Sequence, residues 1–356
     1  MIRFCAPIFV LIALWPTFGH ATNSREELEQ VLEDLLAWLP GEYTSQPQLY
    51  LERNYGLPPD GEHKERYRLF ARVDVPHIGK NVFYAQSHEF GPDNPIIPGT
   101  QVLYIATIDE ERMAVNVITR RVKDFESYEY AHLDPEKLST IEIDPDFGGH
   151  CDFRWQRHGT QIVGRLTESG SADRDGICTL TSRISGLTMT WNGEWMLNPW
   201  ELWVYDNGYM GDTMDQEKLF QGRHDRTYRR LYKMRRFTCI VNSSTQNGRA
   251  KTSEIVSLHD RGSDYQFKNG EPAAIPLVMT LLRGLWPKDE GLGVAERMRL
   301  YVHEEGMEEP LAESWAEPLA TSIDLKFEGG DASCSLIEAA GDEPDAEQTE
   351  DVGGDL

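Results

Sequence analysis

Short segments of alternating residues dominate this chain from about residue 80 onward, and they constrain its fold more than any other feature. Each segment is rich in β-branched and aromatic residues, and clusters of Gly, Pro and Asp separate one from the next. In the first two thirds of the chain these segments are residues 82–86, 101–105, 113–117, 151–155, 161–166, 187–191, 201–205 and 227–234. Side chains at successive positions of a strand point to opposite faces, so this pattern is typical of half-buried strands. Many short antiparallel strands with turns between them predict a meandering sheet that closes into a barrel.

A second group of candidate strands follows Arg235-Arg236. Its members are residues 237–241, 254–259, 275–282, 298–302 and 322–327. They predict a smaller β-sandwich-like module over residues 237–337, after a barrel domain over residues 22–236. The fold class predicted is therefore mainly β.

One helix is predicted ahead of the strands. Ser24 and Glu27 form an S-x-x-E capping box, and apolar residues recur at helical spacing from Leu28 to Leu39. Pro40-Gly41 then ends the helix. We expect its single apolar face to lie against a sheet or to plug the mouth of the barrel.

The N-terminus carries the pattern of a cleaved signal peptide over residues 1–21. Arg3 supplies a basic start, Phe4 to Phe18 form an apolar stretch, and Gly19-His20-Ala21 provides small residues near the cleavage point. The stretch is too short to span a bilayer comfortably, so no stable membrane anchor is expected. The mature protein is expected to be secreted or periplasmic, with cleavage near Ala21.

Four cysteines remain after such a cleavage: Cys151, Cys178, Cys239 and Cys334. An even number in an exported protein allows two disulfides, with three connectivities. Order along the chain favours Cys151–Cys178 and Cys239–Cys334. No metal site is expected, because no CxxC or HxxxH spacing supports one.

The net charge of the chain restricts the classes of partner that it is expected to bind. A formal charge of −24 argues against nucleic acid, because phosphate backbones require a cationic face. Residues 338–356 hold eight acidic residues and no basic one, which predicts a disordered tail, either a solvating end or a partner-binding arm. The cationic exception is a run of basic residues from Arg226 to Arg236. We interpret it as a solvated strand face, with docking of an acidic partner or of the tail as the alternative.

Five segments, taken in order, resemble the CpcT/CpeT family, whose founding members are phycobilin (chromophore) lyases. They are residues 36–48 (LAWLPGEYTSQPQ), 82–86 (VFYAQ), 149–157 (GHCDFRWQR), 201–209 (ELWVYDNGY) and 222–230 (GRHDRTYRR). The resemblance covers about residues 28–236. It implies a calyx-like, lipocalin-like barrel that holds a linear tetrapyrrole, without a separate cofactor, and that is often a homodimer. The reaction it implies joins the tetrapyrrole to a cysteine thiol of an acceptor protein through a thioether.

The resemblance also suggests site residues. Asp206 and Tyr84 are the catalytic candidates, since such a site needs an acid or base beside the bound chromophore. The ligand-binding candidates are Gln86, Gln101, Tyr104, Arg154, Trp203 and Tyr209. Plainer interpretations remain open: Tyr84 and Trp203 as ordinary sheet aromatics, and Asp206-Asn207-Gly208 as a hairpin turn.

Several positions depart from the family pattern, and two of them bear on the contact with ligand carboxylates. Thr100 and Val102 stand where the family has two arginines, the natural partners of ligand carboxylates, so Arg154 or Arg165 would have to supply that contact. Two hypotheses follow. The first is a chromophore lyase-like protein that binds a linear tetrapyrrole or a similar extended hydrophobic ligand. The second is a non-catalytic periplasmic ligand-binding or envelope interaction protein built on the same barrel.

Overall fold

The computed structural model describes most of the chain between residues 25 and 337. The described residues are 25–54, 56, 63–89, 91, 94–145, 151–168, 176–181, 186–212, 214, 218–220, 228–244, 251–267, 276–288, 292–307 and 309–337. The expected signal peptide and the acidic tail lie outside these residues. No helix in the described part is long and apolar enough to cross a membrane.

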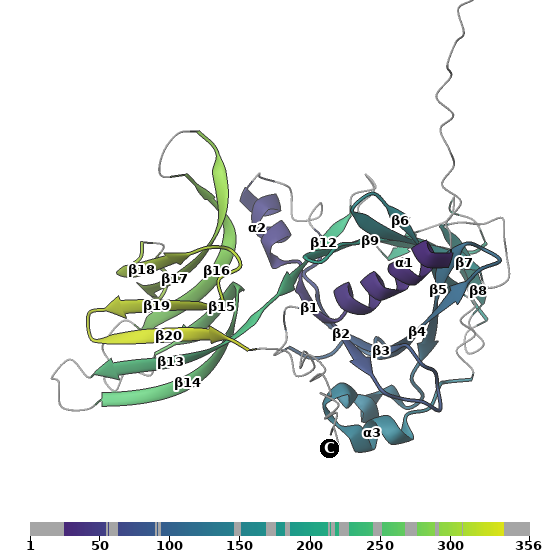
Figure 1. The fold of residues 1–356 in the computed structure, drawn as a ribbon, viewed down its shortest axis with the longest axis horizontal. Coiled ribbons are helices and arrows are strands. Elements are labelled where there is room, and N and C mark those ends of the chain that lie inside the picture. Colours follow the sequence, from purple (N-terminus) through teal and green to yellow (C-terminus); the bar gives the residue numbers. More distant parts are fainter. Residues whose placement is uncertain are drawn as a thin grey trace, which may run out of the picture.

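Ten antiparallel strands close into a barrel, as the alternating segments predicted (Figure 1). Around the ring they are β10 (Glu201–Met210), β12 (Arg229–Met234), β1 (Gly41–Thr44), β2 (Tyr67–Val73), β3 (Val82–His88), β4 (Val102–Asp109), β5 (Ala114–Arg121), β6 (Cys151–His158), β7 (Gln161–Glu168) and β9 (Thr188–Leu197). Pairing of β9 with β10 closes the ring. Two further strands, β8 (Ile177–Thr181) and β11 (Lys218–Phe220), extend the sheet beside β9 and β10.

Helix α1 (Arg25–Trp38) fills one end of the barrel (Figure 1). Its residues Val31 and Leu35 are fully buried and join a core made by the inward side chains of the strands. The Tyr43 hydroxyl donates to the carbonyl oxygens of Trp38 (2.7 Å) and Leu39 (3.0 Å), so the first strand satisfies the end of the helix. Of the two positions predicted for this helix, the structure shows the one in which it plugs the mouth of the barrel.

A helical layer covers the outer face of β3 and β4. It consists of η1 (Phe125–Tyr128), η2 (Ala131–Leu133) and α3 (Pro135–Thr140), and the Asp134 side chain caps α3. Beneath it, Val82, Tyr84 and Leu103 pack against Ala131 and other residues of the layer. Because of this cover, both faces of β3 are buried.

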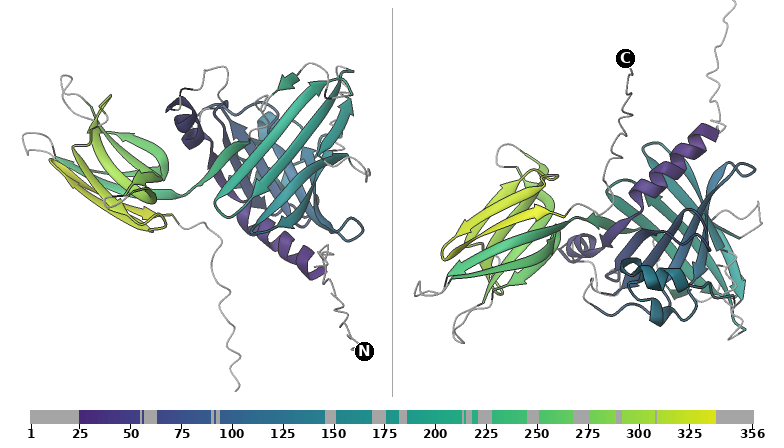
Figure 2. Two further views of the ribbon diagram at one scale, coloured as in Figure 1. Left: turned by 90° about the horizontal axis from the view of Figure 1, so that it is seen from above. Right: turned by 60° about the horizontal axis from the view of Figure 1, so that its bottom comes forward.

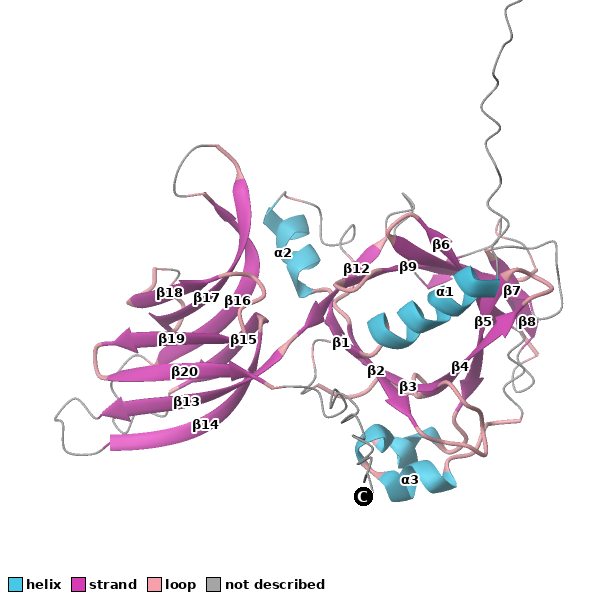
Figure 3. Cartoon of the chain, in the orientation of Figure 1, coloured by secondary structure: helices cyan, strands magenta, loops and turns pink. Residues whose placement is uncertain are grey.

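The C-terminal strands form two four-stranded sheets (Figure 3). One contains β14 (Lys251–His259), β13 (Arg236–Ser244), β20 (Gly330–Leu336) and β19 (Ser322–Phe327); the other contains β15 (Arg261–Gln266), β16 (Leu277–Pro287), β17 (Val294–Glu304) and β18 (Ala312–Ala316). Both contribute to one core, in which Phe237 and Leu325 meet Met279 and Leu300. The sandwich-like module predicted from the sequence is confirmed.

Arg235 alone separates β12 from β13, so the chain passes from barrel to sandwich without a linker (Figure 2). Its backbone N–H donates to Asp260 Oδ1 (2.9 Å), and its Nε donates to Oδ2 (2.8 Å). Asp260 has no exposed surface, and the Arg283 guanidinium also faces it, with Nε 3.3 Å from Oδ2. The junction is therefore built around a buried ionic cluster.

Both predicted disulfides are present. Cys151–Cys178 joins β6 to β8, and Cys239–Cys334 joins directly opposed positions of β13 and β20. Two disulfides suggest an oxidising, extracytoplasmic environment.

Candidate ligand cavity

The end of the barrel away from α1 contains a cavity of about 580 Å³. This volume lies within the ~300–1,000 Å³ typical of small-molecule sites. Side chains two residues apart on a strand share a face, so each strand contributes to the packed core and then to the cavity. On β2, Phe70 lies in the packed core and Arg68, two residues earlier, lines the cavity. On β12, Leu231 lies in the core and Arg229, two residues earlier, lines the cavity.

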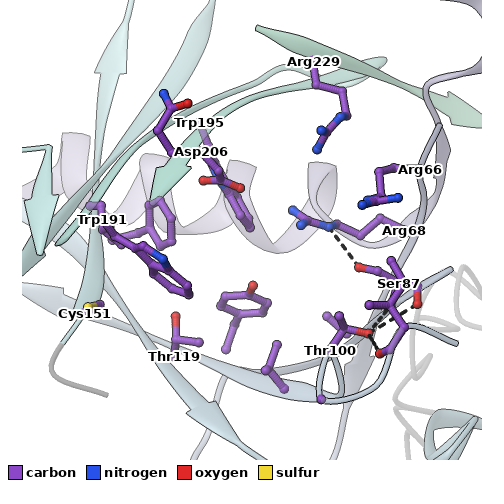
Figure 4. A pocket seen from close by; sticks show the side chains of 18 of the residues that line it. Arg66, Arg68, Ser87, Thr100, Thr119, Cys151, Trp191, Trp195, Asp206 and Arg229 are labelled. Carbon is purple, nitrogen blue, oxygen red and sulfur yellow. Dashed lines mark hydrogen bonds between the residues drawn. The ribbon is translucent and has the colours of Figure 1, made fainter. Parts of the chain in front are cut away.

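Aromatic rings form one wall of the cavity (Figure 4). The ring centroids of Phe153 and Trp195 are 4.6 Å apart, and those of Tyr104 and Trp195 are 5.9 Å apart. Trp191, Leu166 and the disulfide-bonded Cys151 complete this side. The wall offers flat apolar surface for an extended or conjugated molecule.

Arginines gather on the opposite wall. Arg66, Arg68 and Arg229 converge there in Figure 4. Arg68 is held in place, because its Nε donates to Ser87 Oγ (3.2 Å) and its guanidinium lies 5.1 Å from the Trp195 ring centre.

Two donors on the arginine wall are buried without an acceptor among the described residues. Within the described part of the chain, the buried Arg68 Nη1 and Arg229 Nε have no hydrogen-bond partner. Burial, with a smaller contribution from the neighbouring Arg66 and Arg68, lowers the pKa of Arg229 to about 10. A cation in such a position is stabilised by an incoming anion.

Asp206 supplies negative charge on the cavity wall. Trp195 Nε1 donates to Asp206 Oδ1 at 3.0 Å, which fixes the carboxylate beside the aromatic wall. Tyr104 lies nearby, and burial raises its pKa to about 12, with Asp206 adding to the rise and Arg68 opposing it. Of the eight site residues predicted from the sequence, these two line the cavity.

The other catalytic candidate, Tyr84, lies on the outer face of the barrel under the helical layer. Its hydroxyl donates to Gln86 Oε1 (2.9 Å) and to the Tyr128 carbonyl oxygen (2.7 Å), and Gln86 Nε2 lies 3.0 Å from His88 Nε2. Tyr84 and Gln86 share a face, but that face is not the one that lines the cavity. The reason is that alternation pairs residues without saying which face is inside.

The remaining ligand-binding candidates also lie off the cavity. Trp203 is half-buried on the outside, where its Nε1 donates to Glu201 and the Arg230 guanidinium stacks on its ring at 4.7 Å. Arg154 alternates with the inward Phe153 and so lies on the outer face of β6. Gln101 is buried without reaching the cavity, and Tyr209 lies beyond a register shift in β10.

Two plainer interpretations from the sequence are wrong. Asp206-Asn207-Gly208 is not a hairpin turn, because these residues pair with Asn192 and its neighbours inside β10 and β9. The basic run is not a solvated face either, since Arg229 faces the cavity and Arg236 bonds Glu42. Arg226 lies outside the described residues.

Neither Arg154 nor Arg165 supplies the missing arginine contact, since Arg165 bonds Glu194 at 2.7 Å and does not line the cavity. Sequence reasoning missed Arg66 and Arg68. A signal for them exists in the spacing of Lys64, Arg66 and Arg68, which places three cations on one face of an extended segment. Among the described residues, no group of three or more His, Cys, Asp or Glu side chains could hold a metal ion.

No family model matches the chain, and no curated protein matches it. Among solved structures, the CRL protein of Arabidopsis is similar at 16% sequence identity with a TM-score of 0.40. That similarity covers 58% of this chain and 97% of the other.

Proposed function

We propose that the barrel binds an elongated, largely apolar molecule that carries acidic groups. The observation that carries this proposal is the meeting of three arginines with a wall of aromatic rings in one cavity. Acidic groups would bond the guanidinium groups of Arg66, Arg68 and Arg229, while the apolar body would pack on Trp191, Trp195 and their neighbours. Binding would thus supply the acceptors that the buried guanidinium nitrogens lack.

A linear tetrapyrrole is the first ligand to test. The sequence resemblance points to it, and its flat conjugated body with acidic side groups suits both walls. On this proposal, Arg66, Arg68 and Arg229 take the role that Thr100 and Val102 cannot fill. Binding without catalysis is the simpler form of the proposal.

Lyase activity is the second candidate, and the position of Asp206 favours it. This carboxylate lies in the cavity and accepts a hydrogen bond from Trp195, so it would stand beside a bound ligand as a proton donor or acceptor. The reaction would also need an acceptor protein whose cysteine reaches the ligand. That acceptor, like a homodimer, stays a prediction from the sequence resemblance.

The binding test is a titration of purified protein with biliverdin and phycocyanobilin, followed by the visible absorption band. We expect a shifted, sharpened band with the native protein. Arg68→Gln and Arg229→Gln should each weaken binding roughly 10- to 100-fold, because a hydrogen bond to a charged group contributes ~1.5–3 kcal/mol. Arg165→Gln, on the outside of the barrel, is the matched control and should bind like the native protein.

The outcomes separate the two candidates. No spectral change with either pigment rejects a tetrapyrrole, and an equal loss of binding in Arg165→Gln rejects the arginine wall as its cause. Lyase activity requires a covalent, acid-stable pigment on a cysteine-containing acceptor, and Asp206→Asn should slow its formation while leaving binding intact. Tyr84→Phe should change neither measurement, because Tyr84 lies off the cavity.

A further inference from the structure

We infer that the cavity selects a ligand whose acidic head carries two negative charges, rather than one. This inference rests on the proposed function and specifies the chemistry of the ligand at that site. It follows from the charges of the cavity, from the positions of its unmet donors and from the position of Asp206 beside Trp195.

The charges around the cavity are unbalanced. Lys64, Arg66, Arg68 and Arg229 contribute four positive charges to its wall, and Asp206 contributes one negative charge. Glu89 Oε1 lies 3.9 Å from Arg66 Nη1, and the Glu89 side chain is half exposed. Among the described residues, two positive charges are left without a match.

A further acidic residue near Arg229 is already engaged. The carboxylate of Glu52 bonds His63, with Oε1 2.6 Å from Nδ1 and Oε2 accepting from the His63 backbone N–H at 3.0 Å. Neither residue lines the cavity. Glu52 therefore attracts Arg229 only from a distance and does not neutralise it.

The unmet donors belong to two different guanidinium groups. They are Arg68 Nη1 and Arg229 Nε, both buried and without an acceptor in the described residues. Arg68 cannot easily turn away, because Ser87 and Trp195 hold its guanidinium. An anion that offers one oxygen to each arginine would satisfy both donors, and a head with several charged oxygens does this best.

Asp206 sets the orientation of the ligand. Its carboxylate lies on the aromatic side, bonded to Trp195, and would repel a second acidic group placed there. Both negative charges of the ligand are therefore expected at the arginine wall, with the apolar body against Trp191 and Trp195. A phosphate monoester and a pair of neighbouring carboxylates share this chemistry.

The test compares amphiphiles that differ only in their heads. Dodecyl phosphate and dodecylsuccinate carry two charges above about pH 7, dodecanoate carries one, and dodecyltrimethylammonium carries the opposite charge. Binding is measured by calorimetry and by the fluorescence of the cavity tryptophans, at concentrations below micelle formation. We expect both dianions to bind at least roughly tenfold more tightly than dodecanoate, and the cation not to bind.

Substitutions of the arginines test which residues cause the preference for dianions. Arg68→Gln and Arg229→Gln should each reduce the advantage of the dianions over dodecanoate, while Arg165→Gln should keep it. A difference between dodecyl phosphate and dodecylsuccinate tells which dianion the site prefers. Dodecanoate binding as tightly as the dianions would overturn the inference and leave the proposed function standing.

If no amphiphile binds, a measurement with the anion alone distinguishes the proposed function from the dianion site. In that case the proposed function fails, and the anion site is tested with inorganic phosphate alone. Phosphate should then raise the melting temperature more than chloride at equal ionic strength, and Arg229→Gln should abolish that difference. Equal melting temperatures in the two salts would refute the dianion site as well.

Discussion

Gly164 on β7 lies directly under the largest buried ring of the barrel. A Cβ added at this position would lie 2.7 Å from Trp155 Cδ2 and 2.8 Å from Cζ2, and closer still to Cε2, far inside van der Waals contact. The clash is with the rigid indole, which is 1% exposed and cannot swing away as a flexible chain end could. Gly164→Ala therefore forces the Trp155 ring or the β7 backbone to move.

The neighbours of Trp155 set the size of the effect. Its ring meets Trp195 edge-on at 6.5 Å and Phe153 at 6.5 Å, so a displaced indole pushes into both. Overpacking of this kind costs ~1–3 kcal/mol, and restriction of the unfolded chain by alanine returns ~0.4–1 kcal/mol. The net loss of about 1–2 kcal/mol should lower the melting temperature of the barrel by roughly 2–8 °C.

Thermal unfolding followed by near-ultraviolet circular dichroism measures this loss. Gly284→Ala is the matched control, because its nearest atom is Trp286 Nε1 at 3.8 Å, and we expect it to be nearly neutral. In a Trp155→Leu background the alanine at position 164 should cost less, since the smaller side chain leaves room. A melting temperature of Gly164→Ala within about 1 °C of the native protein would refute the reasoning.

Three further effects on stability follow from buried groups. Asp260→Asn removes the buried negative charge that faces Arg235 and Arg283 at the barrel–sandwich junction and should cost ~3–5 kcal/mol, measured by urea unfolding. Replacing Cys239 and Cys334 by serine opens a loop of 95 residues and should cost ~4.7 kcal/mol, against ~3.6 kcal/mol for the 27-residue loop of the barrel disulfide. Burial lowers the pKa of Lys233 to about 8, below its unfolded value, so the unfolded chain binds more protons above pH 8. Between pH 8 and about 9.5 the native protein should therefore gain on the order of 1–2 kcal/mol, a gain that Lys233→Met should remove.

The strands with regular alternation could be predicted from the sequence, among them β10 with Asp206 and β12 with Arg229, but β2, which carries Arg68, could not. Residues 82–86 and 201–205 lie within β3 and β10 because one face of each is apolar. On β2, Arg68 and Phe70 share the inward face, so the charge required by the cavity interrupts the apolar pattern that identifies a strand. Arg68 therefore makes β2 difficult to recognise as a strand from the sequence alone.

The sequence also does not show which face of a strand points into the barrel. Every residue of β3 from Val82 to His88 is buried, because the helical layer covers the face that would otherwise meet water. Tyr84 and Ala85 are therefore equally consistent with a cavity when only the sequence is known. The charge of Asp206 beside aromatic residues makes it a candidate, but the sequence does not show that it lies within a strand, because Asn-Gly is common in turns.

Closure of the barrel also has a kinetic consequence. The closing partners of β1 lie on β12, where Glu42 is opposite Met234 and Thr44 is opposite Tyr232, about 190 residues later in the chain. Such a long loop makes the joining of these two strands slow, whereas neighbouring hairpins such as β6–β7 form locally. Until it occurs, β1 and β12 each expose an unpaired edge, and aggregation competes with folding there. The β1–β12 pairing is the last to form, and it lies beside Arg229. The arginine wall is therefore complete only when the barrel has closed.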